Sequence, residues 1–408
     1  MIPKAALLRL KEAPWLRDPA TQQIFGLLGG AQGKTRAVGG AVRDTLVEHP
    51  RAAREIDFAT ELLPAEVMRR AAEAGIGAYP TGIEHGTVTL KVGERVAEVT
   101  TLREDVITDG RRAVVRFGYD WTRDAERRDF TLNALYCDME GELFDPIGGA
   151  EDCLGGVVRF IGDAARRIAE DRLRVYRFFR FTASHGNERF DEDGLEAVTA
   201  AAGTLSELSA ERVGAEMRRM IELPRVARSF EAMATAGVMA LPAELLERLG
   251  LYERRVHRPN AVARLALLAH SLGSDALKRA WRLSNDEVAT AEAVLGAARL
   301  LRDFQVNEAA YRFPAVLAEA VDVAATLSGW TEAGKSAVLQ HLEAIEVPRF
   351  PVSGGDLMRL GMRPGPALGA ALERLERAWI DSGFTLDREA LLARRGEASQ
   401  PESPPARE

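Results

Sequence analysis

The pattern of apolar and polar residues changes character near residue 150. Before that point, short runs in which apolar and polar residues alternate stand between segments with helical spacing. From about Val157 the alternation stops, and nearly every later segment has the spacing of a helix. The pattern therefore predicts an α+β fold, in which a mixed sheet with helices packed on it is followed by an all-helical region.

The first strands and helices are delimited by glycine and proline. Residues 1–30 predict one or two amphipathic helices, and a short strand at 36–38 then runs into Gly39-Gly40. A helix with the sequence AVRDTLV follows, and the alternating EIDF segment at 55–58 predicts the next strand. Pro64 suits a first helical turn, and Gly75 ends that helix.

Three further strands are predicted at 77–82, 87–92 and 95–102, with Gly93-Glu94 joining the last two as a hairpin. The segment 103–116 is polar, charged and broken by Gly110, so we interpret it as a mobile loop rather than an element. Residues 143–156 are rich in turn residues and predict an exit from the sheet.

The stretch from Gly39 to Asp57 is the first candidate for chemistry. Paired glycines let backbone N–H groups approach a polyphosphate, at the positive end of the following helix. Glu55 and Asp57 alternate on a strand, so their carboxylates project from one face and suit a hard cation such as Mg²⁺. A Gly-Gly pair alone is more often an ordinary turn, and two alternating carboxylates alone are more often a solvated strand face. Their occurrence together in one strand–turn–helix–strand unit favours a phosphate- and metal-binding site. Glu98 is either a third acidic group or a surface strand residue.

Two arginine-bearing segments are further candidates. In 163–186, Arg174, Arg177 and Arg180 have helical spacing and Asp171 lies one turn earlier, which predicts a polar stripe. A solvated ion-pair face is the usual explanation, but the apolar residues between them leave a narrow polar side that suits an anionic partner. In 124–138, the charges around Arg128 could form a helix-end ion-pair set or clamp a phosphate.

Composition limits the class of protein. The apolar content of 46% and charged content of 28% are those of a globular protein, and no run reaches the roughly 18 apolar residues of a membrane span. Two cysteines and the lack of a signal-peptide pattern predict a cytoplasmic location. The net charge of −7 opposes a general coating of nucleic acid, but 54 Lys and Arg allow a local basic channel.

Seven segments, in this order and spacing, resemble the class II tRNA nucleotidyltransferases, the CCA-adding enzymes, a family that also contains bacterial poly(A) polymerases. They are GGAVRD (39–44), EIDFAT (55–60), EVTTLRED (98–105), RRDFTLNAL (127–135), FDPIGG (144–149), EDRLRVYRFFRF (170–181) and SAERV (209–213). The resemblance covers about the first 220 residues and is looser beyond them. Seven linked motifs are far more specific than a lone glycine motif.

The resemblance implies four parts: a polymerase-β-like nucleotidyltransferase head (1–156), a nucleotide-selecting helical neck (157–223), and a tRNA-binding helical body and tail (224–393), before a disordered end (394–408). The implied reaction adds C, C and A to the 3′ end of tRNA without a nucleic-acid template, from CTP and ATP, with release of pyrophosphate. Glu55 and Asp57 would bind Mg²⁺ in a two-metal site, and Glu98 would assist.

The resemblance also assigns roles to the basic residues. Gly40 and Arg43, beside Gly39, match positions that contact the triphosphate, and Arg128, Asp129 and Asn133 match those that contact ribose and phosphate. Asp171 and Arg174 would select the base, because cytosine and adenine both present an amine donor beside a ring-nitrogen acceptor. Arg177 and Arg180 match further nucleotide contacts. Neither a membrane nor an obligatory protein partner is implied.

One departure leaves alternatives open. The family's first metal ligand is usually aspartate, whereas this chain has Glu55, whose extra methylene shifts the carboxylate by over an ångström. The alternatives are a poly(A) polymerase, an enzyme that adds only CC or only A, and a tRNA-binding homologue with weakened chemistry. The arginine-bearing segment 103–116 favours addition of the terminal A, since the family links that segment to this step.

Overall fold

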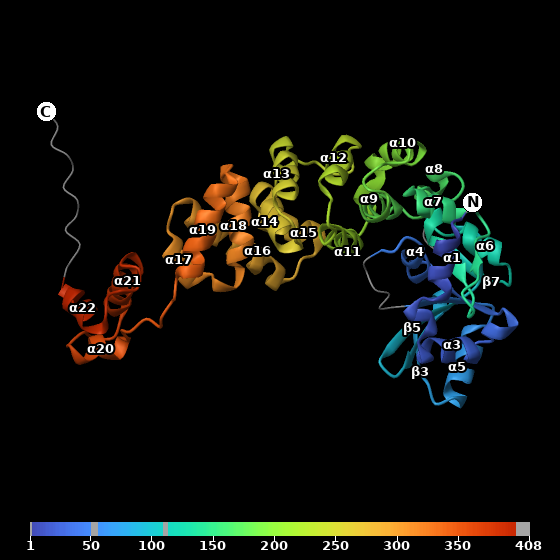
Figure 1. Ribbon diagram of the computed structural model, residues 1–408, viewed down its shortest axis with the longest axis horizontal. Coiled ribbons are helices and arrows are strands. Elements are labelled where there is room, and N and C mark those ends of the chain that lie inside the picture. The colour runs from blue at the N-terminus through green and yellow to red at the C-terminus, as the bar shows by residue number, and fades with distance from the viewer. Residues whose placement is uncertain (1, 50–55, 109–112, 397–408) are drawn as a thin grey trace. The chain divides into compact units, whose positions relative to one another are not determined.

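A computed structural model describes residues 2–49, 56–108 and 113–396, and these divide between two compact units, Met1–Leu241 and Pro242–Glu408 (Figure 1). The first unit contains the sheet and the helices up to α12, and the second is helical. The division into head, neck, body and tail at the expected residues stays a prediction.

The first unit is built on a mixed seven-stranded sheet with the order β3-β4-β5-β2-β1-β8-β9. Its central strands β2 and β5 run parallel, and all other neighbours run antiparallel. The strands are β1 (Thr35–Val38), β2 (Ile56–Thr60), β3 (Gly77–Gly82), β4 (Thr87–Val92), β5 (Arg95–Thr101), β8 (Tyr136–Cys137) and β9 (Leu143–Phe144). The predicted strands and the Gly93-Glu94 hairpin are confirmed.

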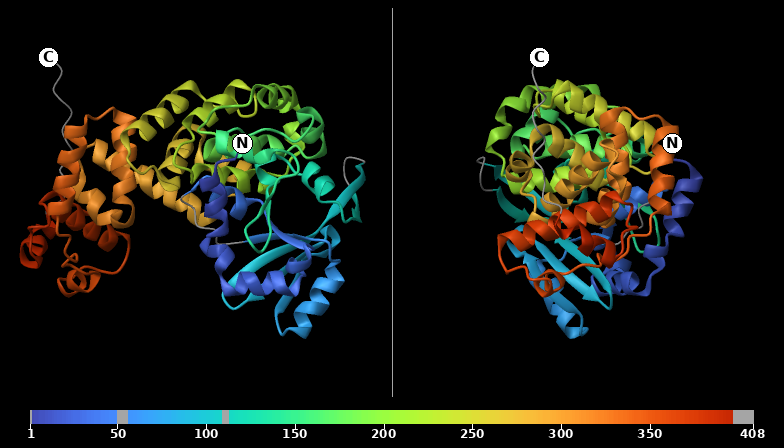
Figure 2. Two further views of the ribbon diagram at one scale, coloured as in Figure 1. Left: turned by 45° about the vertical axis from the view of Figure 1, so that its right-hand side comes forward. Right: turned by 90° about the vertical axis from the view of Figure 1, so that its left-hand side faces the viewer.

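Helices cover the two faces of this sheet unequally. On one face, Phe25 of α3 (Pro19–Leu27) packs edge-on against Phe58 of β2, with ring centroids 5.0 Å apart. The helix α5 (Pro64–Glu73) contacts β3 and β4, and its light blue ribbon lies beside these strands in Figure 2. On the other face, Trp121 of α6 (Trp121–Glu126) packs on a buried cluster that includes Val38 and Tyr136. The α6 side of the sheet is therefore covered over β1 and β8.

Two predictions for the connecting segments are wrong. The described parts of 103–116 are strands rather than a loop: β6 (Arg103–Thr108) and β7 (Ala113–Phe117) pair antiparallel as a separate two-stranded sheet. Their β-branched residues on either side of Asp109-Gly110 give a hairpin signal that the high charge obscured. Residues 143–156 are more than a turn-rich exit, since they contain β9 and the helix α7 (Gly149–Gly155).

The remaining helices of the first unit are α1 (Lys4–Lys11), α2 (Pro14–Arg17), α4 (Gly40–Leu46), α8 (Ala164–Glu170), α9 (Arg174–His185), α10 (Glu192–Ala201), α11 (Ala210–Ile221) and α12 (Ala227–Thr235), with short 3₁₀ turns at Gly30–Gln32, Ile83–His85, Thr131–Asn133 and Ala202–Glu207. The N-terminal segment forms three α-helices rather than one or two. Of the helices that follow, α4 packs on β1 and β2, and α9 packs against α8, α11 and α12.

The second unit is helical throughout its described part, as predicted. Its α-helices are α13 (Ala243–Arg255), α14 (Ala261–Leu272), α15 (Ser274–Trp281), α16 (Asn285–Arg302), α17 (Val306–Arg312), α18 (Leu317–Ser328), α19 (Glu332–Ala344), α20 (Gly354–Arg359), α21 (Pro366–Asp381) and α22 (Arg388–Ala393). Trp379 is the centre of a separate cluster formed by α20, α21 and α22. Arg394–Gly396, predicted as disordered, form a 3₁₀ turn, and the rest of that prediction lies outside the described residues. Among the described helices, none is long and apolar enough to cross a membrane.

Candidate active site

Asp57 and Glu98 are neighbours on adjacent parallel strands. They are register partners in β2 and β5, so their side chains project from the same face, and both are exposed. Phe58, the next residue along β2, points to the opposite face and is 1% exposed. Glu98 therefore lies beside Asp57, which was one of the two alternatives left open for it, whereas Glu55 lies outside the described residues.

The two carboxylates line an open cleft of about 220 Å³. The cleft is also lined by Thr87 and Thr100 and by three arginines, Arg103, Arg127 and Arg128. No group of three or more His, Cys, Asp or Glu side chains that could hold a metal is present among the described residues. Asp57 and Glu98 supply two carboxylates, the oxygen ligands that Mg²⁺ prefers, and the nearby arginines suit a polyphosphate.

The glycine turn before α4 has the predicted strand–turn–helix form. Gly39 has φ 74° and ψ −123°, a backbone conformation that L side chains rarely adopt, and its N–H donates to the carbonyl of Leu135 at 3.0 Å. Gly40 begins the helix and Arg43 lies one turn further on. The Arg43 side chain is buried, with Nε donating to Asp44 at 2.7 Å and Nη1 donating to Oδ1 of Asn133 at 2.5 Å.

Asp124 fixes the two arginines that precede β8. Its fully buried carboxylate pairs with Arg127 at 2.5 Å and with Arg128 at 3.1 Å, and it accepts the Tyr136 hydroxyl at 2.8 Å. Burial alone would raise the pKa of Asp124, but the charges of Arg128 and Arg127 outweigh it and hold that pKa below its ordinary value. Both arginines therefore keep a fixed position at the wall of the cleft.

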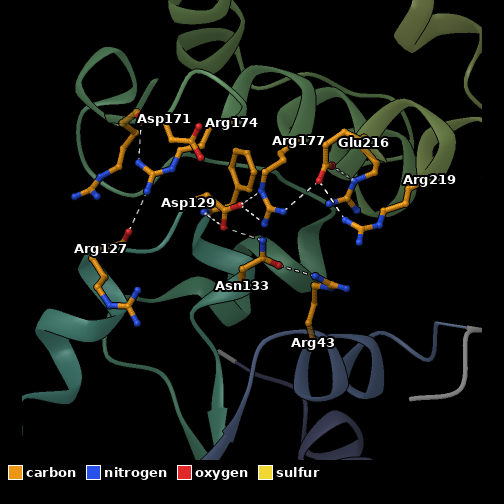
Figure 3. A network of polar contacts seen from close by, with 12 residues as sticks. Arg43, Arg127, Asp129, Asn133, Asp171, Arg174, Arg177, Glu216 and Arg219 are labelled. Carbon is orange, nitrogen blue, oxygen red and sulfur yellow. Dashed lines mark hydrogen bonds and ion pairs between the residues drawn. The ribbon is translucent and has the colours of Figure 1, made fainter. Parts of the chain in front are cut away.

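Asp129 connects the sheet domain to α9. Its Oδ1 accepts the side-chain amide of Asn133 at 3.0 Å, and its Oδ2 accepts Nε of Arg177 at 2.7 Å (Figure 3). Burial opposes ionisation of Asp129, but the Arg177 charge and these hydrogen bonds lower its pKa. Since Asn133 also accepts Arg43, one continuous chain of contacts joins α4 to α9.

Glu216 of α11 extends this network to the other side of α9. Its side chain is 4% exposed and contacts Nε of Arg180 at 2.5 Å, Nη1 of Arg219 at 3.3 Å and Nη1 of Arg177 at 3.6 Å (Figure 3). The guanidinium carbon of Arg180 lies over the ring of Phe181, 4.2 Å from the ring centroid. Arg177 and Arg180 are thus held by a buried carboxylate and an aromatic ring.

Asp171 and Arg174 differ from the expected continuous helical stripe. Asp171 has extended backbone angles and ends α8, whereas α9 begins at Arg174, and in the turn between them the Asp171 carboxylate accepts the N–H of Leu173 at 3.1 Å. Asp171 also accepts Arg212 at 2.8 Å, while Arg174 donates to Glu170 at 2.8 Å and to the carbonyl of Arg127 at 3.2 Å.

Of the predicted basic residues, the structure places Arg128 in the cleft with Asp57 and Glu98. One polar network contains Arg43, Asp129, Asn133, Arg177 and, through Glu216, Arg180. Asp124, Glu216 and Arg212 have structural roles that the sequence did not assign. Asp124 could have been found from its spacing of three and four residues to Arg127 and Arg128, and Glu216 from its spacing of three to Arg219.

Family comparisons cover both units. A poly A polymerase head domain matches residues 35–159, a probable RNA- and SrmB-binding site of polymerase A matches 189–242, and a putative tRNA nucleotidyltransferase domain 2 matches 261–394. The matched regions contain the carboxylate pair, Asp129, Asn133 and Glu216 of the polar network, and most of the second unit, whereas Arg177 and Arg180 lie between two of them.

Full-length relatives agree with these matches. The human mitochondrial CCA tRNA nucleotidyltransferase 1 is 32% identical over 96% of this chain and 94% of its own. The CCA-adding enzyme of Streptococcus sanguinis is 32% identical over 87% and 91%. The crystal structure of the Bacillus stearothermophilus CCA-adding enzyme in complex with CTP superposes with a TM-score of 0.75, at 29% identity, over 92% of this chain and 98% of that one. This chain therefore belongs to the family of CCA-adding tRNA nucleotidyltransferases.

Proposed function

We propose that this protein adds C, C and A to the 3′ end of tRNA, using CTP and ATP and releasing pyrophosphate. The observation that carries the proposal is the pairing of Asp57 with Glu98 on parallel strands, in a cleft walled by arginines, within a chain that matches this family along nearly its whole length. Attack by the RNA 3′ hydroxyl on the α-phosphorus requires charge stabilisation more than covalent chemistry from the protein.

The carboxylates form the chemical part of the proposed site. Glu55 and Asp57, assisted by Glu98, would hold Mg²⁺ in a two-metal site, which lowers the pKa of the attacking hydroxyl and neutralises the triphosphate. Arg127 and Arg128 would face the anionic substrate from the cleft wall, where Asp124 already holds them in position.

The nucleotide would lie between the glycine turn and α9. Gly39, Gly40 and Arg43 would contact the triphosphate, and Arg128, Asp129 and Asn133 the ribose and phosphates. The existing contacts of Arg43 with Asn133, and of Asn133 with Asp129, support this role because they fix these side chains before a ligand binds.

Base selection would use Asp171 and Arg174 as a protein template. A carboxylate acceptor and a guanidinium donor match the edge that cytosine and adenine share and leave unpaired groups against uracil and guanine. Each side chain is held in position by a hydrogen bond to a neighbouring residue: Asp171 accepts from Arg212, and Arg174 donates to Glu170. We propose Arg177 and Arg180 as further nucleotide contacts.

One assay distinguishes this function from its alternatives. The protein is incubated with Mg²⁺ and tRNA lacking its last three nucleotides, with CTP and ATP supplied singly and together, and product length is read on a gel. Three added nucleotides support CCA addition. A long ladder identifies a poly(A) polymerase, incomplete ends identify a CC- or A-adding enzyme, and no extension identifies a binding homologue.

Two further proposals concern the surroundings of the enzyme. We propose that Arg218 and Arg219, with the arginines of α9, form a local positive channel for tRNA, which predicts a steep salt dependence of binding. We also propose a cytoplasmic location, which is supported by two free, buried thiols, Cys137 and Cys153, that suit a reducing compartment.

A further inference from the structure

The face of the sheet that bears Asp57 and Glu98 continues beyond them as an exposed surface. Register partners across successive strands place Val38, Asp57, Glu98, Thr89 and Tyr79 in one row, from β1 to β3. Partners in a row point to the same face. Glu98 is exposed, Thr89 is half-buried and Tyr79 is 53% exposed, so the row leads from the carboxylates to an open edge of the sheet.

The chemistry of this surface suits a nucleic-acid strand. Tyr79 packs against Gly77, where an added Cβ would lie 3.3 Å from its hydroxyl and 3.4 Å from Cε2, so the ring rests on bare backbone. The exposed Lys91 is the register partner of Gly77. Threonine hydroxyls pair across these strands, Thr81 with Thr89 at 2.7 Å and, two residues along β4, Thr87 with Thr100 at 3.0 Å.

The direction of the reaction points to the same surface. Phosphoryl transfer places the attacking and leaving oxygens roughly in line on opposite sides of the phosphorus. Gly39, Gly40 and Arg43, the groups proposed to hold the leaving pyrophosphate, follow β1, on one side of β2. The RNA end that carries the attacking 3′ hydroxyl must then approach Asp57 from the other side, over β5, β4 and β3. The cleft itself extends in this direction, to Thr87 on β4 and Thr100 on β5.

We propose that the open face of β3, β4 and β5 binds the unpaired 3′ end of the tRNA. A base upstream of the reacting hydroxyl stacks on Tyr79, and Lys91 contacts a phosphate. Three strand spacings separate Asp57 from Tyr79, about 14 Å between their Cα atoms, so the stacked base is not the terminal one. Stacking on an aromatic ring accepts any base, as a surface that binds successive nucleotides of the growing end must.

The test measures RNA binding directly and therefore does not depend on catalysis. The ligand is a fluorescent RNA hairpin that carries an acceptor stem with an unpaired 3′ end, and affinity is read by anisotropy. Tyr79→Ala is expected to weaken binding about tenfold, and Tyr79→Phe, which keeps the ring, to bind as the wild type does. Lys91→Ala is expected to lower the slope of log Kd against log salt by about 0.7, and Lys91→Arg to retain it.

Because this inference rests on the proposed function, addition to tRNA is measured on the same variants. The Tyr79→Ala enzyme should show a raised KM for tRNA and an unchanged KM for CTP, whereas a general folding defect would change both and lower the unfolding temperature. Equal RNA affinity for Tyr79→Ala and wild type overturns the inference while CCA addition stands. A wild-type protein that binds the hairpin through Tyr79 but adds no nucleotide overturns the proposed function alone.

Discussion

Arg177 directs two nitrogens at a single oxygen of Asp129, with Nε at 2.7 Å and Nη2 at 2.6 Å from Oδ2. The Asp129 side chain is 9% exposed, so this charge-assisted contact is largely shielded from water. It joins α9, which bears the proposed nucleotide-contacting arginines, to the segment that bears Asn133. The arginines are therefore positioned relative to the sheet before any nucleotide is bound.

Asp57→Asn is expected to abolish nucleotide incorporation, with a loss of about a thousandfold or more, because an amide cannot replace an anionic metal ligand. Asp57 is exposed, so the free energy of unfolding should stay within about 0.5 kcal/mol of the wild type. Initial rates with CTP and Mg²⁺, beside urea unfolding, measure both quantities. Glu94→Gln, in the nearby hairpin, is the matched control and should leave the rate unchanged, and an active Asp57→Asn enzyme would refute the metal assignment.

Asp171→Ala is expected to reduce discrimination against UTP and GTP by about tenfold to a hundredfold, since each mismatched buried polar group costs about 1–3 kcal/mol. The measurement is kcat/KM for each of the four nucleoside triphosphates on tRNA that lacks its CCA end. Arg172→Gln is the control, because Arg172 is adjacent in the chain but pairs with Glu207 at 2.9 Å on the surface. Unchanged ratios in Asp171→Ala would show that the base is selected elsewhere.

Glu216→Gln is expected to destabilise the protein by about 3 kcal/mol, because it leaves the buried guanidinium of Arg180 without its anionic partner. The same change should raise KM for CTP and ATP more than KM for tRNA, as Arg177 and Arg180 lose their fixed positions. Urea unfolding and steady-state kinetics test the two effects. Arg219→Gln, whose side chain is 60% exposed, should change stability little, and a Glu216→Gln enzyme with wild-type KM values would limit Glu216 to a purely structural role.

Local patterns were sufficient to predict most of the sheet. Alternation at 87–92 and 95–102, with Gly93-Glu94 between them, predicted both strands and their hairpin, but it left open whether Glu98 lies beside Asp57. The pairing of β2 with β5 was not predictable from spacing, because it joins segments about forty residues apart through parallel register. Charge obscured the hairpin at 103–116, where β-branched residues were the better signal.

Partners far apart in sequence account for what the motifs missed. The motif at 170–181 identified Asp171 and Arg174, but not that Arg212 and Glu170 hold them separately. Helical spacing placed Asp171 one turn before Arg174 on the same helix, whereas its carboxylate accepts the N–H of Leu173 in a turn that separates α8 from α9. A short polar side chain that can bond its own backbone competes with helix continuation, and periodicity does not detect that competition.

His185 is expected to make stability fall as the solution becomes acidic. Its Nε2 lies 3.0 Å from Oδ1 of Asp44, its Nδ1 lies 2.7 Å from the Ser184 hydroxyl, and its ring stacks on His49 with centroids 4.9 Å apart. Burial, opposed by the hydrogen bond to Asp44 and reinforced by the Arg43 charge, lowers the pKa of His185 to about 4. The folded protein therefore keeps this ring neutral at pH 5, where the unfolded chain, with an ordinary pKa of about 6.5, binds a proton.

Between pH 7 and pH 5 this difference favours the unfolded state by about 2 kcal/mol, since the folded pKa lies below the unfolded one and stability is lost as pH falls through that interval. Urea unfolding of the wild type and of His185→Gln at both pH values isolates the contribution of His185, because every other titrating group is common to the two proteins. The stability advantage of the wild type over the variant should shrink by about that amount at pH 5. Parallel pH profiles for the two proteins would show that His185 titrates normally in the folded state.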